Sequence, residues 1–234
     1  MGTRTGFSDA RERGGDRAPA RKNMVRELVE TVLVCVVFVL FLRAFVFQQS
    51  EIPSASMETT ILIGDHVLVN RFIYAPTSFG WERRLLPIRE IRRGDVVVFK
   101  HPPGPEQDFI KRVVGLPGET IALRHGTLLV NGLPVDEPYL AEEERFGKSF
   151  GPVRIEPDHY FLLGDHRSRS SDSREWGAAP RELIKGRAFM ILFSTSAAPP
   201  PGQPPGQVTA KSLARKLFNM VFRSRWERWF SLVR

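Results

Sequence analysis

One apolar run near the N-terminus limits how the rest of this chain can fold. Residues 28–47 are twenty residues dominated by Val, Leu and Phe, and residues 31–42 contain no charged side chain. A helix of this length spans about 30 Å, the thickness of a bilayer core. We therefore expect one transmembrane anchor helix over 28–47. Because the uncharged part is short for a membrane span, a buried core helix is the alternative.

The charges around this run predict its orientation. Glu30 and Arg43 lie near its two ends, where their side chains can reach the membrane interface. Basic residues collect on the cytoplasmic side of a membrane helix. Arg21, Lys22 and Arg26 lie just before the run. We expect a cytoplasmic N-terminus, with the chain after residue 47 on the opposite side. A cleaved signal peptide is a second alternative, but cleavage at residues 54–56 would remove the serine motif described below.

The net charge of +8 is concentrated in the two ends of the chain. Residues 1–27 carry net +3 and residues 207–234 carry net +6, so the residues between them carry −1. A nucleic-acid-binding domain is expected to have a basic face in its folded part. The distribution instead favours anionic membrane lipid as a partner and argues against nucleic acid. Residues 1–27 are interpreted as a disordered, basic, cytoplasmic tail.

Short strand-like runs between turn signals dominate residues 48–196. These runs are residues 67–70, 95–100, 109–114, 121–123, 128–130 and 160–163. Arg93-Gly94-Asp95, Leu116-Pro117-Gly118 and Asn131-Gly132 separate them as turns. His125-Gly126 lies between two runs and predicts a hairpin. Strands and helices do not alternate, so the pattern indicates a mostly β domain with an antiparallel sheet or barrel.

Two further segments follow the β-rich domain. Residues 197–206 are rich in Pro and Gly and predict a semi-rigid linker. In residues 207–234, apolar side chains recur at helical spacing and aromatic residues alternate with arginines. This pattern predicts a basic amphipathic helix on a membrane surface. A helix docked on the domain or on a partner is the alternative.

Ser56 and Lys111 form the candidate catalytic pair. A serine hydroxyl needs a base to take its proton, and a lysine can be that base only when burial disfavours its charged form. The apolar neighbours of Lys111, among them Phe109 and Ile110, can supply that burial. Ser54 lies two residues before Ser56, so on an extended chain both side chains point the same way. Its hydroxyl and the Ser56 N–H can hold a developing oxyanion.

Four segments in order resemble the conserved boxes of type I signal peptidases. They are residues 54–57, residues 94–99, residues 111–118 and residues 164–177, which follow the expected anchor. The resemblance covers residues 28–195. It implies a membrane-anchored serine endopeptidase that removes signal peptides from exported preproteins, after small-x-small motifs, without a cofactor. It also implies a bacterial-type inner membrane, with the catalytic domain on the outer side.

The resemblance implies a role for each matching residue. Ser56 matches the nucleophile, Lys111 the general base and Ser54 the side-chain donor of the oxyanion hole. Ser170 matches a hydroxyl that orients the lysine amine. The structural supports and the positions lining a narrow substrate pocket are Asp165, Asp172, Arg174, Ile52, Pro53, Phe109 and Ile110. A narrow apolar pocket rejects large side chains sterically, which agrees with small-x-small cleavage.

Several positions depart from the family pattern, and two rival functions stay open. Thr59 stands where the family usually has proline, and His166, Ser168 and Arg169 differ from it in the box after Asp165. These departures leave a non-catalytic envelope scaffold as one rival. A self-cleaving peptidase is the other, because it uses the same Ser–Lys chemistry. The five histidines lack metal-ligand spacing, so we expect no metal site. A triad of Ser56 with His166 and Asp165 is disfavoured because adjacent residues rarely present that geometry.

Overall fold

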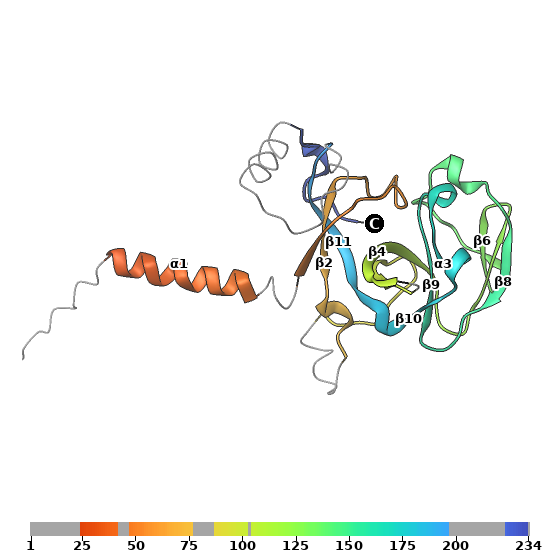
Figure 1. Ribbon diagram of the computed structural model, residues 1–234, viewed down its shortest axis with the longest axis horizontal. Helices are drawn as coiled ribbons and strands as arrows, with labels where there is room; N and C mark the ends of the chain where they lie inside the picture. Colours follow the sequence, from red (N-terminus) through yellow and green to blue (C-terminus); the bar gives the residue numbers. More distant parts are fainter. Residues whose placement is uncertain (1–23, 42–46, 77–86, 103, 197–222, 234) are drawn as a thin grey trace, which may run out of the picture. The chain divides into compact units, whose positions relative to one another are not determined.

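A computed structural model describes residues 24–41, 47–76, 87–102, 104–196 and 223–233 (Figure 1). The chain divides into two compact units, residues 1–40 and residues 41–234. The predicted linker at 197–206 lies outside the described residues, as do residues 1–23 of the tail and residues 207–222.

The described part of the first unit, residues 24–40, lies in helix α1, Met24–Phe41. Its Val, Leu and Phe side chains are exposed, and none of its residues is buried. The predicted anchor continues past its end into residues 42–46, which are not among those described. Of the helices that the structure describes, none combines the length and apolarity needed to cross a bilayer. The membrane anchor therefore stays a prediction.

The second unit contains a seven-stranded sheet in which every pair of neighbouring strands is antiparallel. The order is β1 (Phe47–Glu51), β2 (Asp65–Asn70), β11 (Ile184–Ser194), β3 (Val96–His101), β4 (Gly104–Gly115), β9 (His159–Leu163) and β10 (Ala179–Pro180). Figure 1 shows β11 running beside β2. The mostly β, antiparallel fold class is confirmed.

A second sheet has four strands in the order β7 (Leu133–Pro134), β6 (Thr127–Val130), β5 (Thr120–Arg124) and β8 (Phe150–Arg154). The predicted hairpin at His125-Gly126 is confirmed, since Arg124 pairs with Thr127 across this two-residue loop. Both loop residues have positive φ, 49° for His125 and 91° for Gly126. That is the backbone of the two-residue turn whose twist matches the flanking strands.

Short 3₁₀ turns and one short helix connect the strands of the second unit. They are η2 (Phe72–Tyr74), η3 (Glu142–Arg145), η4 (Arg167–Arg169), α3 (Ser173–Trp176), η5 (Arg181–Leu183) and η6 (Trp226–Arg228). All six predicted runs lie within strands or overlap them. Strands β1, β7, β8, β10 and β11 were not predicted from sequence. β11 carries Lys185, Gly186 and Arg187 in its first half, which hides the strand pattern.

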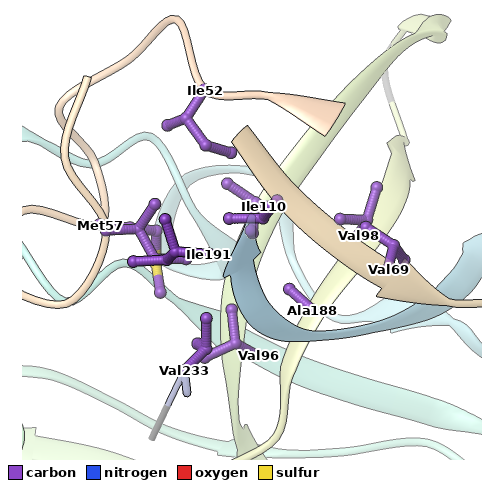
Figure 2. Packing of buried hydrophobic residues seen from close by; sticks show 11 residues of the cluster. Ile52, Met57, Val69, Val96, Val98, Ile110, Ala188, Ile191 and Val233 are labelled. Atoms are coloured by element: carbon purple, nitrogen blue, oxygen red, sulfur yellow. The ribbon is translucent and has the colours of Figure 1, made fainter. Parts of the chain in front are cut away.

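The cluster of buried side chains beneath the first sheet joins distant parts of the chain (Figure 2). Met57 from the serine loop, Ile110 from β4 and Ile191 from β11 belong to it, and Val233 from the end of the chain is only 5% exposed. Each such side chain stabilises the fold by about 1.5–3 kcal/mol through burial. The cluster therefore fixes the serine loop, the lysine strand and the C-terminal segment in one unit.

The C-terminal segment corrects one prediction. Residues 223–233 do not form an amphipathic α-helix; they form the short turn η6 between β-bridges from Ser224 to Thr195 and from Leu232 to Met190. Arg228 pairs with the buried Asp65 at 2.6 Å. Part of the basic and aromatic pattern therefore belongs to a segment that packs on the domain.

Candidate active site

Ser56 lies in the loop that joins β1 to β2. Two backbone bonds close the base of this loop, Ile52 N–H to the Asp65 carbonyl at 3.0 Å and Gly64 N–H to the Ile52 carbonyl at 3.1 Å. The following residue, Met57, is fully buried in the core. The His166 N–H donates to the Ser56 carbonyl at 3.2 Å. Contacts on both sides of Ser56 therefore fix its position, and Ser56 itself is 6% exposed.

Lys111 lies on β4, between β3 and β9, and is 3% exposed. Its Nζ donates to Ser56 Oγ at 2.7 Å and to the Ile110 carbonyl at 3.1 Å. Burial lowers the pKa of the Lys111 amine to about 8, while the charges of Asp172 and Asp165 oppose this shift. The sheet therefore brings together two residues that are 55 positions apart, and it holds a weakly basic amine against a serine hydroxyl.

Ser54 lies beside the pair, as predicted from its two-residue spacing. Its Oγ is 3.3 Å from Ser56 Oγ. The residue is exposed, whereas Ser56 is buried. A hydroxyl at this place is available to a group that approaches Ser56 from solvent.

Asp165 forms a buried ion pair that sequence reasoning did not foresee. Its carboxylate accepts from Arg112 Nε at 2.8 Å and from Arg112 Nη2 at 2.6 Å, and it also accepts from Thr60 Oγ1 at 2.6 Å. Arg112 follows Lys111, so its side chain points to the other face of β4. The only sequence signal for Arg112 was its place inside the lysine box. The pair ties β4 to the loop after β9 and to the serine loop.

Asp172 and Arg174 form the predicted ion pair, at 2.8 Å. Arg174 Nη2 also donates to the Arg167 carbonyl at 2.7 Å, and Asp172 Oδ2 accepts from the Gly164 N–H at 3.1 Å. These bonds connect the two ends of the 164–174 loop, so the loop that faces the serine is braced by its own side chains.

Ser170 is near the site, but the structure does not connect it to Lys111. Within the described part of the chain, its Oγ is buried and has no hydrogen-bond partner. The second acceptor for the Lys111 amine is the Ile110 carbonyl. The lysine-orienting role of Ser170 stays a prediction.

The four predicted substrate-lining residues divide into two groups. Ile52 and Ile110 are buried in the core cluster. Pro53 is exposed, and Phe109 is partly buried, with its ring 5.5 Å from Lys111 Nζ. Ile52 and Ile110 can therefore form only the floor of a substrate groove, while Pro53 and Phe109 are accessible to a bound chain.

The backbone of Thr59 explains why this chain departs from the family pattern there. Its φ is 73°, a left-handed conformation that is uncommon for a β-branched residue. Proline is fixed near −65° and cannot adopt it. The Thr59 hydroxyl donates to the Tyr139 carbonyl at 3.3 Å. The serine loop of this chain thus has a shape that proline would not allow.

His166 does not act as the middle of a triad in this arrangement. Its ring nitrogens lie 3.4 Å from Glu58 and 3.3 Å from Glu144. Its contact with the serine loop is through its backbone N–H. The side chain that reaches Ser56 Oγ is Lys111.

A serine hydroxyl held against a buried amine of lowered pKa has the parts of a serine hydrolase, a nucleophile and its base. Comparison with known proteins agrees with this class. The family model described as signal peptidase, peptidase S26, matches residues 25–193. The chain belongs to this family and is a serine endopeptidase.

Named relatives extend over most of the chain. A signal peptidase I of Pseudomonas aeruginosa is 37% identical over 193 residues, which cover 67% of this chain and 68% of the relative. A probable signal peptidase I-2 of Synechocystis is 34% identical over 188 residues, covering 78% and 80%. A crystal structure of a signal peptidase I from Enterococcus faecalis matches with TM-score 0.38 and 31% identity, covering 43% of this chain and 97% of that one.

Proposed function

We propose that this chain is a membrane-anchored endopeptidase that removes N-terminal signal peptides from exported preproteins by a Ser–Lys dyad. The observation that carries the proposal is the 2.7 Å bond between Lys111 Nζ and Ser56 Oγ. An amine with a pKa of about 8 is neutral in a useful fraction of molecules near neutral pH, whereas a free lysine is not.

The first chemical step uses the neutral amine as the base. Lys111 Nζ takes the Ser56 hydroxyl proton while Oγ attacks the scissile carbonyl carbon, and the carbonyl electrons move to its oxygen. Ser54 Oγ and the Ser56 N–H donate to this oxyanion. As the oxyanion collapses, the C–N bond breaks and the Lys111 ammonium gives its proton to the leaving amine. The mature protein leaves, and the signal peptide stays as an ester on Ser56.

The second step returns the enzyme to its starting state. Neutral Lys111 takes a proton from a water molecule, which attacks the ester carbonyl. Collapse of the second oxyanion expels Ser56 Oγ, which recovers its proton from the lysine. The signal peptide leaves with a new carboxylate. The ion pairs at Asp165 and Asp172 support the loops on which these atoms lie.

The proposal also names the substrate and the membrane location of the enzyme. Preprotein signal peptides are the substrates, with small-x-small cleavage set by a groove over Ile52 and Ile110. Residues 28–47 anchor the chain in a bacterial-type inner membrane, with the N-terminus cytoplasmic and the catalytic domain outside. The exposed apolar side chains of α1 and the basic charge of the chain ends support this placement, and anionic lipid is the proposed partner of those ends. An anchored enzyme meets a membrane-held substrate at high effective concentration.

The direct test is processing of a purified preprotein by Ser56→Ala and Lys111→Met variants. Removing the nucleophile or its base is expected to lower the processing rate more than about 1,000-fold. Ser171→Ala and Lys100→Met are matched controls on exposed side chains and are expected to process normally. Circular dichroism checks that each variant is folded.

Retention of substantial activity by either folded variant would exclude the dyad. Wild-type protein that cuts only its own chain would favour the self-cleaving rival. A wild-type protein that cuts no preprotein at all would favour the envelope-scaffold rival.

A further inference from the structure

Tyr139 lies outside the four family boxes, yet it contacts the residues that support the dyad. It belongs to the connection between β7 of the small sheet and the turn η3. Its carbonyl accepts a hydrogen bond from the Thr59 hydroxyl at 3.3 Å, and Thr59 lies three residues after Ser56. The connection that leaves the small sheet therefore touches the serine loop.

The ring of Tyr139 covers one face of the Arg112 guanidinium. Arg112 Cζ lies 3.8 Å from the centre of this ring, and the Arg112 side chain is buried. An aromatic face attracts a cation that is stacked on it, more strongly where water is excluded. The edge of the same guanidinium donates to Asp165, and it donates to the Gly94 carbonyl at 2.9 Å. The ring thus helps to fix the plane in which Arg112 meets its partners.

Glu137 holds the ring in this position. The Tyr139 hydroxyl donates to Glu137 Oε1 at 2.5 Å, and Arg167 Nη2 donates to the same oxygen at 2.5 Å. Burial and the charge of Glu137 raise the pKa of the Tyr139 hydroxyl, which therefore stays protonated as a donor. Glu137 and Arg167 are both buried, so this bond is shielded from water. The orientation of the ring is set by a buried hydrogen bond as well as by packing.

The Arg112–Asp165 pair connects the ring to both members of the dyad. Asp165 accepts from Thr60 Oγ1 at 2.6 Å, so it holds the serine loop. Burial lowers the pKa of Lys111, whereas the charges of Asp172 and Asp165 raise it. A guanidinium that is kept against Asp165 offsets the charge of that carboxylate and weakens its effect on the lysine.

We propose that Tyr139 is a positioning residue for the Ser–Lys dyad. The ring keeps the Arg112 guanidinium on Asp165, and Asp165 in turn keeps the serine loop in place. With the guanidinium on it, Asp165 also favours the charged form of Lys111 less. This role rests on the proposed Ser–Lys chemistry. Through it, the connection from the small sheet contributes to the geometry of a site that lies on the large sheet.

The test compares Tyr139→Leu with Tyr139→Phe in the full-length chain in detergent micelles, with a peptide that contains a cleavage site as substrate. Leu removes the ring, and the loss of one buried cation–π contact is expected to lower kcat about tenfold. KM should stay within about threefold of wild type, because Tyr139 acts through Arg112 and not on the substrate. Phe keeps the ring and is expected to restore kcat to within about threefold of wild type.

The pH profile separates positioning from a merely structural role. In Tyr139→Leu the midpoint of kcat/KM is expected to move to higher pH by about half a unit or more, because Asp165 is less well neutralised. The other titratable neighbours of Lys111 are Asp172 and His101, whose own pKa is lowered by burial and by the lysine charge. The substitution leaves both of them in place.

Tyr160→Leu is the matched control, because it removes another tyrosine ring from the second unit. Tyr160 is buried on β9, in the apolar cluster that also contains Leu162. Arg112 pairs with Leu163 in the sheet, and side chains alternate along a strand, so Tyr160 points to the face opposite Arg112. The control is expected to lose stability while the folded enzyme keeps the wild-type kcat and midpoint.

A second comparison keeps the shape of the side chain and changes only the charge on its face. Phenylalanine and its pentafluoro analogue at position 139 have nearly the same shape, but fluorine withdraws the negative charge from the ring face that attracts a cation. The pentafluoro ring is expected to lower kcat about threefold to tenfold relative to phenylalanine. This comparison decides the question if the leucine variant does not fold, and equal rates for the two rings would contradict the proposal.

A folded Tyr139→Leu variant with the wild-type kcat, or with an unchanged midpoint, would overturn the inference. An equal loss in Tyr160→Leu would also overturn it, and so would a change in KM alone, which would place Tyr139 at the substrate. The dyad variants keep the two proposals apart. Activity in Ser56→Ala or Lys111→Met contradicts the dyad itself, whereas inactive dyad variants beside an unimpaired Tyr139→Leu contradict only the role of Tyr139.

Discussion

The Lys111 side chain has to be buried to act as a base, and burial makes its charged form unfavourable. In the unfolded chain the amine titrates near 10.5, whereas in the folded chain its pKa falls to about 8. Between these two pH values the unfolded chain binds more protons than the folded one. Folding stability therefore rises with pH across this range, and at neutral pH the protein carries the whole cost of the buried amine.

Lys111→Met is therefore expected to change stability in a pH-dependent way. Met has a similar volume and no charge, so at pH 7 the variant avoids a cost of about 3 kcal/mol. Part of that gain is offset because Ser56 Oγ and the Ile110 carbonyl lose the amine. The stability of the variant relative to wild type should fall by about 3 kcal/mol between pH 7 and pH 10.5. Urea unfolding at both pH values measures this difference, and an equal difference at both would show that Lys111 is not shifted.

The sequence predicted the pair and part of its support, but not the buried arginine beside it. Ser56 and Lys111 were recognisable because each needs an unusual environment and because the family boxes surround them. Arg112 was not recognisable, because its burial depends on an ion pair with Asp165. Asp165 lies 53 residues away, and sequence alone does not show that contact. The motif also does not specify the side-chain rotamers that leave Ser170 Oγ without a hydrogen bond to Lys111.

Among the elements, the loop after β9 packs closely against the serine loop. A methyl group built on Gly164 would lie 2.2 Å from Ser170 Oγ and 2.4 Å from the Ser56 carbonyl oxygen. The second of these is backbone and cannot simply rotate away. The glycine of the Gly164-Asp165 box is therefore explained by the close approach of two loops, not by its own φ.

Gly164→Ala is expected to move Ser56 relative to Lys111 while the sheets stay folded. A displacement near 1 Å at a reacting atom can lower the rate by about 100-fold. The measurement is kcat/KM on a peptide substrate, together with the melting temperature. Gly104→Ala is a matched control, because a methyl group built there meets no neighbour and the residue does not need a positive φ. Activity that is unchanged in Gly164→Ala would contradict the close loop contact.

The strands differ in whether nearby residues or distant partners determine them. The His125-Gly126 hairpin was predictable because two residues determine its turn. β11 was not, because its pairing with both β2 and β3 depends on partners far away in the sequence. Its charged first half still fits the sheet, since Lys185 pairs with Asp108 at 2.5 Å and Arg187 lies 3.2 Å from Asp95.

At the scale of the whole molecule, residues 223–233 pack against the rest of the second unit. Arg228 pairs with Asp65, which is fully buried, and donates to the Thr60 carbonyl at 3.0 Å in the serine loop. Val233 fills the core cluster that also holds Met57. The C-terminal segment therefore supports the same loop that carries the nucleophile.

Arg228→Ala is expected to destabilise the protein by about 2 kcal/mol, because the buried Asp65 carboxylate loses a charge-assisted bond. Chemical unfolding of the full-length chain measures this change. Arg223→Ala removes an equally basic side chain that is exposed, and it should leave stability within about 0.5 kcal/mol of wild type. Equal effects of the two substitutions would show that the segment is held only by nonspecific charge.

The most direct test of the account is the pH dependence of kcat/KM for cleavage of a peptide that has no titrating group between pH 6 and 11. Only the neutral Lys111 amine accepts the Ser56 proton, so the rate should rise about tenfold per pH unit and level off above a midpoint near 8. A midpoint near 10.5, or a rate independent of pH over this range, would contradict a buried lysine base.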